Sequence, residues 1–276
     1  MCEFCVKHGE GKKWYLQARN YGLDLASDVR RQRFIADFFN NPQKLQQSVR
    51  DLDRLDRLPR LMQSAIRGWV TRSMKKWHFG QVVPLEDVRE MLGIVNSVVR
   101  VPCICRAINR GDKQARYCFG VSVGQGAIAF AKVDPSYASG PDTTMTESVT
   151  TDQALDIMRD LEQEGLVHSV WSFVTPFIGG ICNCDRSDCM AMIATVGHDT
   201  KVMFKAEWVA AVDWDSCRGC RSCMRQCQFG AIGYSASADK CVIDQHRCWG
   251  CGVCRAACRQ DAISLGPRAD AAALGW

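Results

Sequence analysis

The sequence predicts an α+β protein made of three parts and a short tail. Residues 24–77 carry apolar side chains at three- and four-residue steps, which is typical of helices that bury one face. Residues 84–174 alternate short helical patterns with β-branched runs that favour strands. Residues 217–258 contain a repeated cysteine pattern. The division that we expect is a helical part at 1–80, an α+β part at 81–207, a cysteine-rich part at 208–266 and a tail at 267–276.

Length and composition exclude several classes of protein. The chain has 276 residues, 47% of them hydrophobic, so it can bury one large or two modest cores. The most apolar segment, 170–182, contains Pro176 and is shorter than the roughly 18 residues of a membrane-spanning helix. The N-terminus lacks the apolar core of a signal peptide. We therefore interpret the seventeen cysteines as metal ligands in a reducing cytoplasm rather than as disulfides.

Prolines divide the helical part into separate helices. The apolar stripe at 29–39 predicts a first helix, and Pro42 suits the first turn of a second one. Pro59 ends the second helix, and the apolar residues at 62–70 predict a third. None of these helices carries a recognisable catalytic motif.

The central part mixes helices and strands. Thr150 and Gln153 form a capping box that opens a helix continuing to Glu164. Residues 134–148, rich in threonine, glycine and proline, predict an exposed loop. The remaining predicted elements are a short helix at 84–93 and strands at 97–101, 117–123, 127–133 and 166–174.

Two cysteine runs with identical spacing lie in the C-terminal part. Cys217-x2-Cys220-x2-Cys223-x3-Cys227 returns 31 positions later as Cys248-x2-Cys251-x2-Cys254-x3-Cys258, which makes the segment an internal repeat. Three thiolates two residues apart can surround one face of an iron–sulfur cube. The fourth ligand must then come from elsewhere in the chain.

This spacing resembles that of two-cluster, bacterial-type ferredoxin domains, over residues 208–266. In that family the fourth cysteine of each run binds the other cluster. The resemblance therefore implies two [4Fe-4S] clusters, one held by Cys217, Cys220, Cys223 and Cys258 and the other by Cys248, Cys251, Cys254 and Cys227. Structural zinc is the alternative, although two zinc sites need no third cysteine in each run. Gln228 and Arg259 stand where the family usually has proline.

A second group of cysteines lies in the central part. Its members are Cys103, Cys105, Cys118, Cys182, Cys184 and Cys189. A Cys-x-Cys-Arg segment followed by Cys-Asn-Cys, upstream of a ferredoxin domain, resembles multi-cluster iron–sulfur proteins of anaerobic bacteria and archaea. The resemblance implies at least one further iron–sulfur cluster, and zinc or an unligated redox-active thiol group are the alternatives. Cys2 and Cys5 are further candidate ligands, whereas Cys241 fits a buried free thiol on a strand.

Charge is distributed unevenly along the chain, whose formal net charge is +5. Residues 1–80 hold sixteen Lys or Arg and eight Asp or Glu, a local +8. This part either exposes a solvated basic face or docks an acidic partner or a membrane interface. Because thiolate-bound clusters add negative charge that the formal count omits, we expect no nucleic-acid partner.

These patterns indicate an electron-transfer iron–sulfur protein. About 200 residues lie outside the ferredoxin segment, so we expect a subunit of a cytoplasmic anaerobic oxidoreductase rather than a free carrier. Its expected partner is a redox protein such as a flavoprotein. One alternative is a reductase whose reaction centre lies at Cys103 and Cys182, and another is an iron–sulfur redox sensor. No catalytic residue is assigned, because no Ser/His/Asp or paired-carboxylate arrangement can be assembled.

Overall fold

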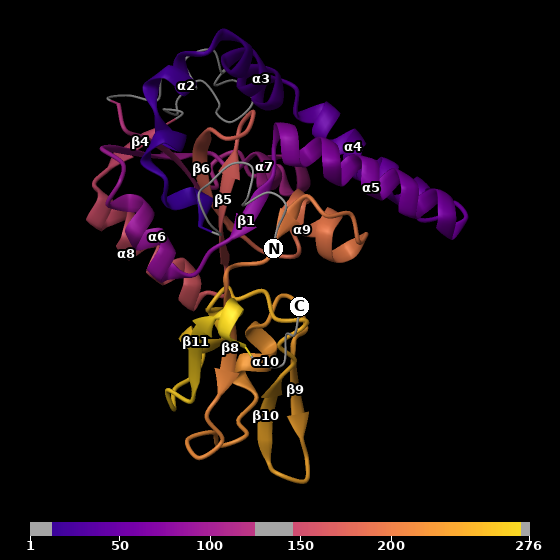
Figure 1. Cartoon of the computed structure of the whole chain (residues 1–276), viewed down its shortest axis with the longest axis vertical. Helices are drawn as coiled ribbons and strands as arrows, with labels where there is room; N and C mark the ends of the chain where they lie inside the picture. Colours follow the sequence, from indigo (N-terminus) through magenta and orange to yellow (C-terminus); the bar gives the residue numbers. More distant parts are fainter. Residues whose placement is uncertain (1–12, 125–145, 272–276) are drawn as a thin grey trace.

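The computed structural model describes residues 13–124 and 146–271 and confirms the α+β class. One large sheet with helices around it forms the upper body in Figure 1, and two small sheets form the C-terminal part below it. The strand predicted at 127–133 lies outside the described residues. Within the described part of the chain, no helix combines the length and the apolar composition needed to cross a bilayer.

Seven strands form the large sheet in the order β4-β2-β3-β6-β5-β1-β7. All neighbouring pairs are antiparallel except β1 and β7, which run parallel. The strands are β1 (Gly80–Val82), β2 (Ser97–Val101), β3 (Cys118–Ser122), β4 (Glu147–Val149), β5 (Val167–Ser172), β6 (Ile178–Cys184) and β7 (Met203–Phe204).

One face of this sheet carries the main apolar core. Val170, Ile181 and Phe119 lie side by side across β5, β6 and β3, and all three are buried. Two helices cover them, α6 (Leu85–Leu92) and α8 (Thr151–Gln163). The predicted capping box at the start of α8 is confirmed, since the Gln153 amide donates to Thr150 Oγ1 at 3.1 Å and the Thr150 amide donates to Gln153 Oε1 at 2.9 Å.

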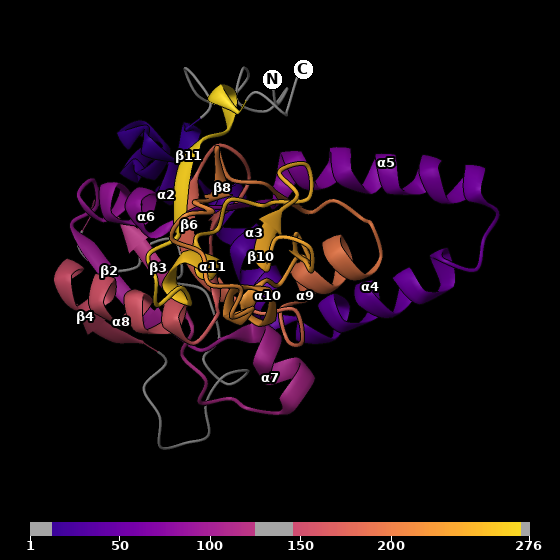
Figure 2. The same cartoon turned by 90° about the horizontal axis from the view of Figure 1, so that it is seen from below.

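The N-terminal helices pack on the opposite side of the sheet and extend beyond it. Ile35 and Phe39 of one helix pack with Trp171 and Phe173. Two later helices form a hairpin that projects from the body (Figure 2). The helices in this region are α2 (Leu23–Ser27), α3 (Val29–Asn40), α4 (Pro42–Leu55) and α5 (Arg60–Trp77). Short helices α7 (Ile104–Arg110) and α9 (Met190–Met192), followed by a π-helical turn at Ile193–Gly197, complete this side.

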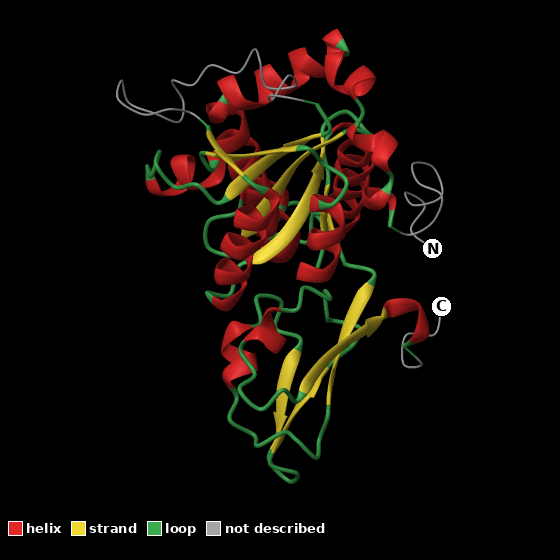
Figure 3. Ribbon diagram, turned by 90° about the vertical axis from the view of Figure 1, so that its left-hand side faces the viewer, coloured by secondary structure: helices red, strands yellow, loops and turns green. Residues whose placement is uncertain are grey.

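The C-terminal part consists of two two-stranded sheets and two short helices (Figure 3). The first and last strands pair with each other, and so do the two middle strands, all antiparallel. This arrangement interleaves the two halves of the repeat. The elements are β8 (Trp208–Val212), α10 (Ser222–Gln226), β9 (Ile232–Ser235), β10 (Lys240–Ile243), α11 (Val253–Ala256) and β11 (Ile263–Pro267).

The repeat extends to the backbone conformation. Gly219 and its counterpart 31 residues later, Gly250, both have a left-handed φ, +62° and +70°. A Cβ at Gly250 would lie 2.0 Å from the carbonyl oxygen of Trp208, and one at Gly219 would lie 2.5 Å from that of Asp239. Only glycine therefore fits at the position just before the second cysteine of each run.

Polar contacts fix the C-terminal part to the body. Asp87 of α6 is fully buried and accepts hydrogen bonds from Lys13, Tyr15 and Trp208, at 2.7, 2.6 and 2.9 Å. Gln228, which stands where ferredoxins usually have proline, donates to the carbonyl of Gly165 at 3.0 Å. The sequence departure at Gln228 thus provides a bond between the two parts.

Glu162 is a buried acid at the same interface. Its carboxylate packs against Gly252 at the start of α11, and Oε1 has no hydrogen-bond partner among the described residues. Burial raises the pKa of Glu162 to about 7, with a further contribution from Glu86, while Arg255 acts in the opposite direction. The folded protein therefore holds this proton more tightly than the unfolded chain does.

We predict that Glu162→Gln flattens the pH dependence of stability at this interface. The folded pKa lies above the ordinary 4.5, so the stabilisation is complete at low pH and is lost as pH rises through the window from 4.5 to about 7. Above that window the variant should gain at most about 3 kcal/mol over the parent. Anaerobic denaturant titrations at several pH values measure this difference, and parallel pH profiles for the two proteins would contradict it.

Candidate metal centres

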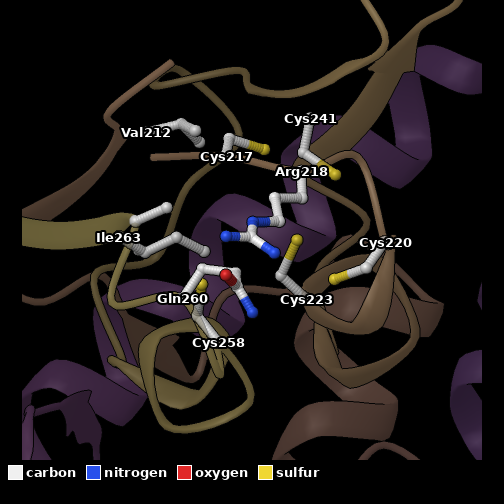
Figure 4. A pocket seen from close by; sticks show the side chains of 10 residues that line it. Val212, Cys217, Arg218, Cys220, Cys223, Cys241, Cys258, Gln260 and Ile263 are labelled. Carbon is white, nitrogen blue, oxygen red and sulfur yellow. The ribbon is translucent and has the colours of Figure 1, made fainter. Parts of the chain in front are cut away.

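The first cavity of the C-terminal part brings together Cys217, Cys220, Cys223 and Cys258 (Figure 4). Its volume is about 320 Å³. Three of these cysteines belong to the first run and one to the second. This is the crossed set that the resemblance to ferredoxins implies.

The second cavity brings together Cys248, Cys251, Cys254 and Cys227. Here the second run supplies three cysteines and the first run supplies one. Its volume of about 330 Å³ is nearly that of the first cavity. The two cavities thus have matching sets of four cysteines, three from one run and one from the other.

Backbone amides point at several of these sulfurs. The amides of Ala210 and Gly250 donate to Cys248 Sγ, each at 3.4 Å. The amide of Ala231 donates to Cys227 Sγ at 3.3 Å. Such bonds stabilise the thiolate form that binds iron, and they favour the more negative, reduced state of a cluster.

Three thiols of the two cavities lie in surroundings that oppose ionisation. Burial raises the pKa of Cys251 well above its ordinary value, and it raises the pKa of Cys254 to about 12. Burial and a hydrogen bond with Cys241 raise the pKa of Cys223 to about 12 as well. In contrast, Cys220 is exposed, and the backbone amide of Ser222 lowers its pKa. Cys223, Cys251 and Cys254 can all be thiolates only beside a strong cationic centre, and iron would supply that charge.

Cys241 also lines the first cavity, which the sequence did not predict. It lies on β10, is 2% exposed, and points into the same space as the four cysteines of this cavity (Figure 4). The expectation of a buried thiol on a strand agrees with its position. The position of β10 in the fold determines that Cys241 faces the first cavity, and the sequence alone does not give that position.

The six central cysteines also come together. Cys182 lies opposite Cys118 across β6 and β3, and Cys184 is two residues further on the same face of the sheet. Cys103 and Cys189 stand at the N-termini of α7 and α9, over this face. Cys2 and Cys5, the other candidate ligands, lie outside the described residues.

These six thiols lie close enough together to influence one another's ionisation. Cys105 and Cys118 both interact with Cys103 and hold its pKa well below its ordinary value. The interaction with Cys103 raises the pKa of Cys105 and of Cys118 well above theirs. Further thiol contacts join Cys118 to Cys182, Cys105 to Cys189 and Cys189 to Cys184. We call this group the six-thiol site.

Arg106 places a buried positive charge beside the six-thiol site. Its guanidinium donates to Cys103 Sγ at 3.7 Å and lies 3.7 Å from the ring centre of Tyr117. Asp185 and Asp188 form ion pairs with it, the latter at 3.5 Å. The arginine of the Cys-x-Cys-Arg segment and the two aspartates that follow Cys-Asn-Cys therefore act together, which the sequence did not reveal.

No single ion fits the thiols as they stand. Among the described residues, no three His, Cys, Asp or Glu side chains are placed to hold one metal ion. In a four-iron cluster each thiolate binds a different iron, so the sulfurs need not converge on one point. A zinc ion at any of the three thiol groups would require them to move.

An apolar cluster connects the six-thiol site with the second cavity. Cys184 and Cys189 belong to the same buried cluster as Cys251 and Phe229. Phe229 stacks on Trp249 with ring centroids 4.6 Å apart and an angle of 7° between the planes, and both rings line the second cavity. The two cavities share a second cluster that contains Cys223 and Cys254. The three thiol groups are thus contiguous, with the second cavity in the middle.

Asn183 fixes the direction of the two cysteines that flank it. It is buried on the opposite face of β6, where its Oδ1 lies 2.6 Å from His168 Nδ1 and its Nδ2 donates to the carbonyl of Tyr117 at 2.8 Å. Burial lowers the pKa of His168 to about 4, so its ring is neutral and can donate this bond from Nδ1. Locking Asn183 to one face holds Cys182 and Cys184 on the other.

We predict that Asn183→Leu destabilises the protein by about 1–3 kcal/mol, because buried His168 Nδ1 loses its partner and the Tyr117 carbonyl keeps only the bond from the backbone amide of residue 183. It should also reduce the metal bound at the six-thiol site. Anaerobic denaturation and iron analysis test both effects. Asn96→Leu is the matched control, since Asn96 makes one exposed hydrogen bond, to the carbonyl of Val123. Equal losses in the two variants would contradict a positioning role for Asn183.

Comparison with known proteins identifies one segment. Residues 216–263 match the family model of the 4Fe-4S dicluster domain, and the match includes all eight cysteines of the two runs. No curated protein matches the chain. The C-terminal part is therefore a 4Fe-4S dicluster domain of the ferredoxin type, which supports an iron–sulfur electron-transfer role.

Proposed function

We propose that this chain is an electron-transfer subunit of a larger oxidoreductase, with two [4Fe-4S] clusters in the dicluster domain and a third iron–sulfur centre at the six-thiol site. When bound, such clusters accept and donate single electrons. The observation that carries the proposal is the pair of crossed cysteine quartets around two cavities of nearly equal volume. The protein's own task is to place and tune its cofactors.

The exposure of the cysteines supports an order along the relay. Cys220 of the first cavity is exposed, so a redox partner can approach this site closely. Cys248, Cys251 and Cys254 of the second cavity are buried. The six-thiol site lies beyond them, across the shared apolar cluster. We infer that electrons enter or leave at the first cavity and pass the second on their way to or from the six-thiol site.

The expected partner is a redox protein such as a flavoprotein, and the expected compartment is a reducing cytoplasm. We base the compartment on the proposed use of the cysteines as metal ligands, which requires reduced thiols. Most of the chain lies outside the dicluster domain, which supports membership of a complex.

A reductase is the second candidate function. The six-thiol site offers two more sulfurs than one cubane needs, and Cys105, Cys118 and Cys182 are only half-buried. The two surplus sulfurs and this partial exposure favour a metal centre at which a reaction takes place. Substrate-induced changes in its spectrum would distinguish this role from that of a simple relay.

Iron and acid-labile sulfide analysis of anaerobically purified protein, combined with electron paramagnetic resonance, tests the proposal. Two cubanes contain about eight iron atoms per chain, and a third centre raises that number. Cys182→Ser combined with Cys184→Ser should return the content to about eight and keep the dicluster signals. Zinc without acid-labile sulfide would contradict the electron-transfer role. About eight iron atoms in the unmodified protein would contradict the third centre but not the two clusters of the dicluster domain.

A further inference from the structure

Helix α5 exposes an apolar face that nothing in the protein covers among the described residues. It has no buried residue along its eighteen positions. Leu61 is 87% exposed and Trp69 is 67% exposed, and Met62 and Ile66 are exposed beside them. These four account for half of the eight exposed large hydrophobic side chains in the described chain. Exposed apolar groups gathered on one face mark an interaction surface.

The charges of α5 have one sign. The helix contains no Asp or Glu, and its five charged residues are Arg60, Arg67, Arg72, Lys75 and Lys76. Arg72 and Lys76 are exposed and follow Trp69 at three- and four-residue steps, so they continue the face that carries the apolar side chains. The surface is apolar toward the tip of the hairpin and cationic toward its base.

The other side of α5 is held in place. Arg67 forms a 2.6 Å ion pair with Asp56 in the turn of the hairpin, and Asp56 also accepts from His198 at 2.7 Å. At the base, the amide of Val174 donates to the carbonyl of Trp77 at 2.7 Å. The hairpin is therefore braced against the body while its outer face remains open, as its projection in Figure 2 shows.

We propose that α5 docks this protein on an anionic lipid surface. A helix with exposed Leu and Trp followed by Arg and Lys can lie in the interface, with its apolar side chains among the acyl chains and its cations at the phosphates. A bilayer accepts such a convex face without a matching groove, whereas a protein partner needs one lined with acidic residues. This inference does not depend on the electron-transfer role.

Vesicle flotation of the anaerobically purified full chain tests the docking surface. We expect binding to vesicles of phosphatidylglycerol with phosphatidylcholine and much weaker binding to phosphatidylcholine alone. Leu61→Gln combined with Trp69→Gln should weaken binding by about tenfold or more, because two large apolar side chains no longer leave water. Arg72→Gln and Lys76→Gln should each weaken it by about fivefold at low salt.

Trp214→Gln is the matched control, because Trp214 is 50% exposed and lies in the dicluster part rather than on α5. It should bind vesicles as the parent does, and all variants should keep the parent's visible spectrum. Absence of binding to the anionic vesicles would overturn the proposal. The ligand of this face would then be a protein partner with an acidic groove. Equal losses in the Trp69 and Trp214 variants would overturn the assignment to α5.

A second inference concerns Cys241, and it rests on the proposed electron-transfer function. The Cys241 thiol lines the first cavity together with the Cys223 thiol, and both side chains face the same space (Figure 4). The residue lies on β10 and pairs with Tyr234 of β9, so the register of the strand pair fixes the face from which its side chain extends. Cys223 belongs to the quartet of this cavity, whereas Cys241 stands outside the repeat.

We infer that Cys241 is a positioning residue that tunes the cluster of the first cavity. With Cys223 bound to iron as a thiolate, the Cys241 S–H can donate a hydrogen bond to that sulfur. Hydrogen bonds to ligating sulfurs stabilise the more negative, reduced state and raise the reduction potential. The second cavity has no cysteine beyond its quartet among its lining residues, so the two clusters are tuned differently.

Redox titration of anaerobically purified variants tests this role. In Cys241→Ala the equilibrium constant for reduction of one cluster should fall about threefold to tenfold, the upper value corresponding to about 59 mV. Cys241→Ser should retain most of the effect. Val242→Ala is the control, because Val242 is exposed and points away from the cavity.

Two results would overturn the tuning role. Unchanged potentials in Cys241→Ala would show that the hydrogen bond has no influence, and loss of iron from that variant would make Cys241 a ligand instead. A parent protein without any iron–sulfur cluster would instead defeat the proposed function. The two failures are therefore distinguishable.

Discussion

The fold depends on keeping many thiols buried close to one another. A buried thiolate is costly, since burial raises the pKa of Cys251 well above its ordinary value, and neighbouring thiols add to the cost, since Cys103 raises the pKa values of Cys105 and Cys118. Three features of this chain offset that cost: amides aimed at sulfur, the guanidinium of Arg106 at Cys103, and donor sets that iron can neutralise. The cysteine groups are therefore the part of the structure that cofactor binding would stabilise most.

The protein gathers its thiols by two different routes. In the dicluster domain, short loops with left-handed residues wrap around each cavity, and Gly250 is required there because the Trp208 carbonyl leaves no room for a side chain. At the six-thiol site, strand register places Cys118 beside Cys182, and helix N-termini bring Cys103 and Cys189 over them. The first route uses residues adjacent in sequence, whereas the second depends on the whole sheet being formed.

This difference explains what could be predicted from the sequence. The crossed quartets could be predicted because all of their determinants lie within a repeat of known spacing, and the α+β class and the Thr150 capping box followed from local patterns. The partners of Arg106, the bond from Gln228 to Gly165 and the direction of Cys241 could not be predicted. Each joins residues far apart in the chain, and no local pattern encodes such a contact.

The part of the chain outside the dicluster domain can hold redox centres at fixed positions, which matters if electrons pass between the dicluster domain and the six-thiol site. Transfer between two centres requires that their separation be fixed, and a domain on a flexible linker would not fix it. Here buried Asp87 binds the N-terminal segment, α6 and β8 together, and Gln228 adds a second bond behind the last cysteine of the first run. Phe229 stacks on Trp249 beside the second cavity and belongs to the same buried cluster as Val82 and Val167 of the large sheet. The body thus holds the dicluster domain against the six-thiol site as one unit, which a free electron carrier would not need.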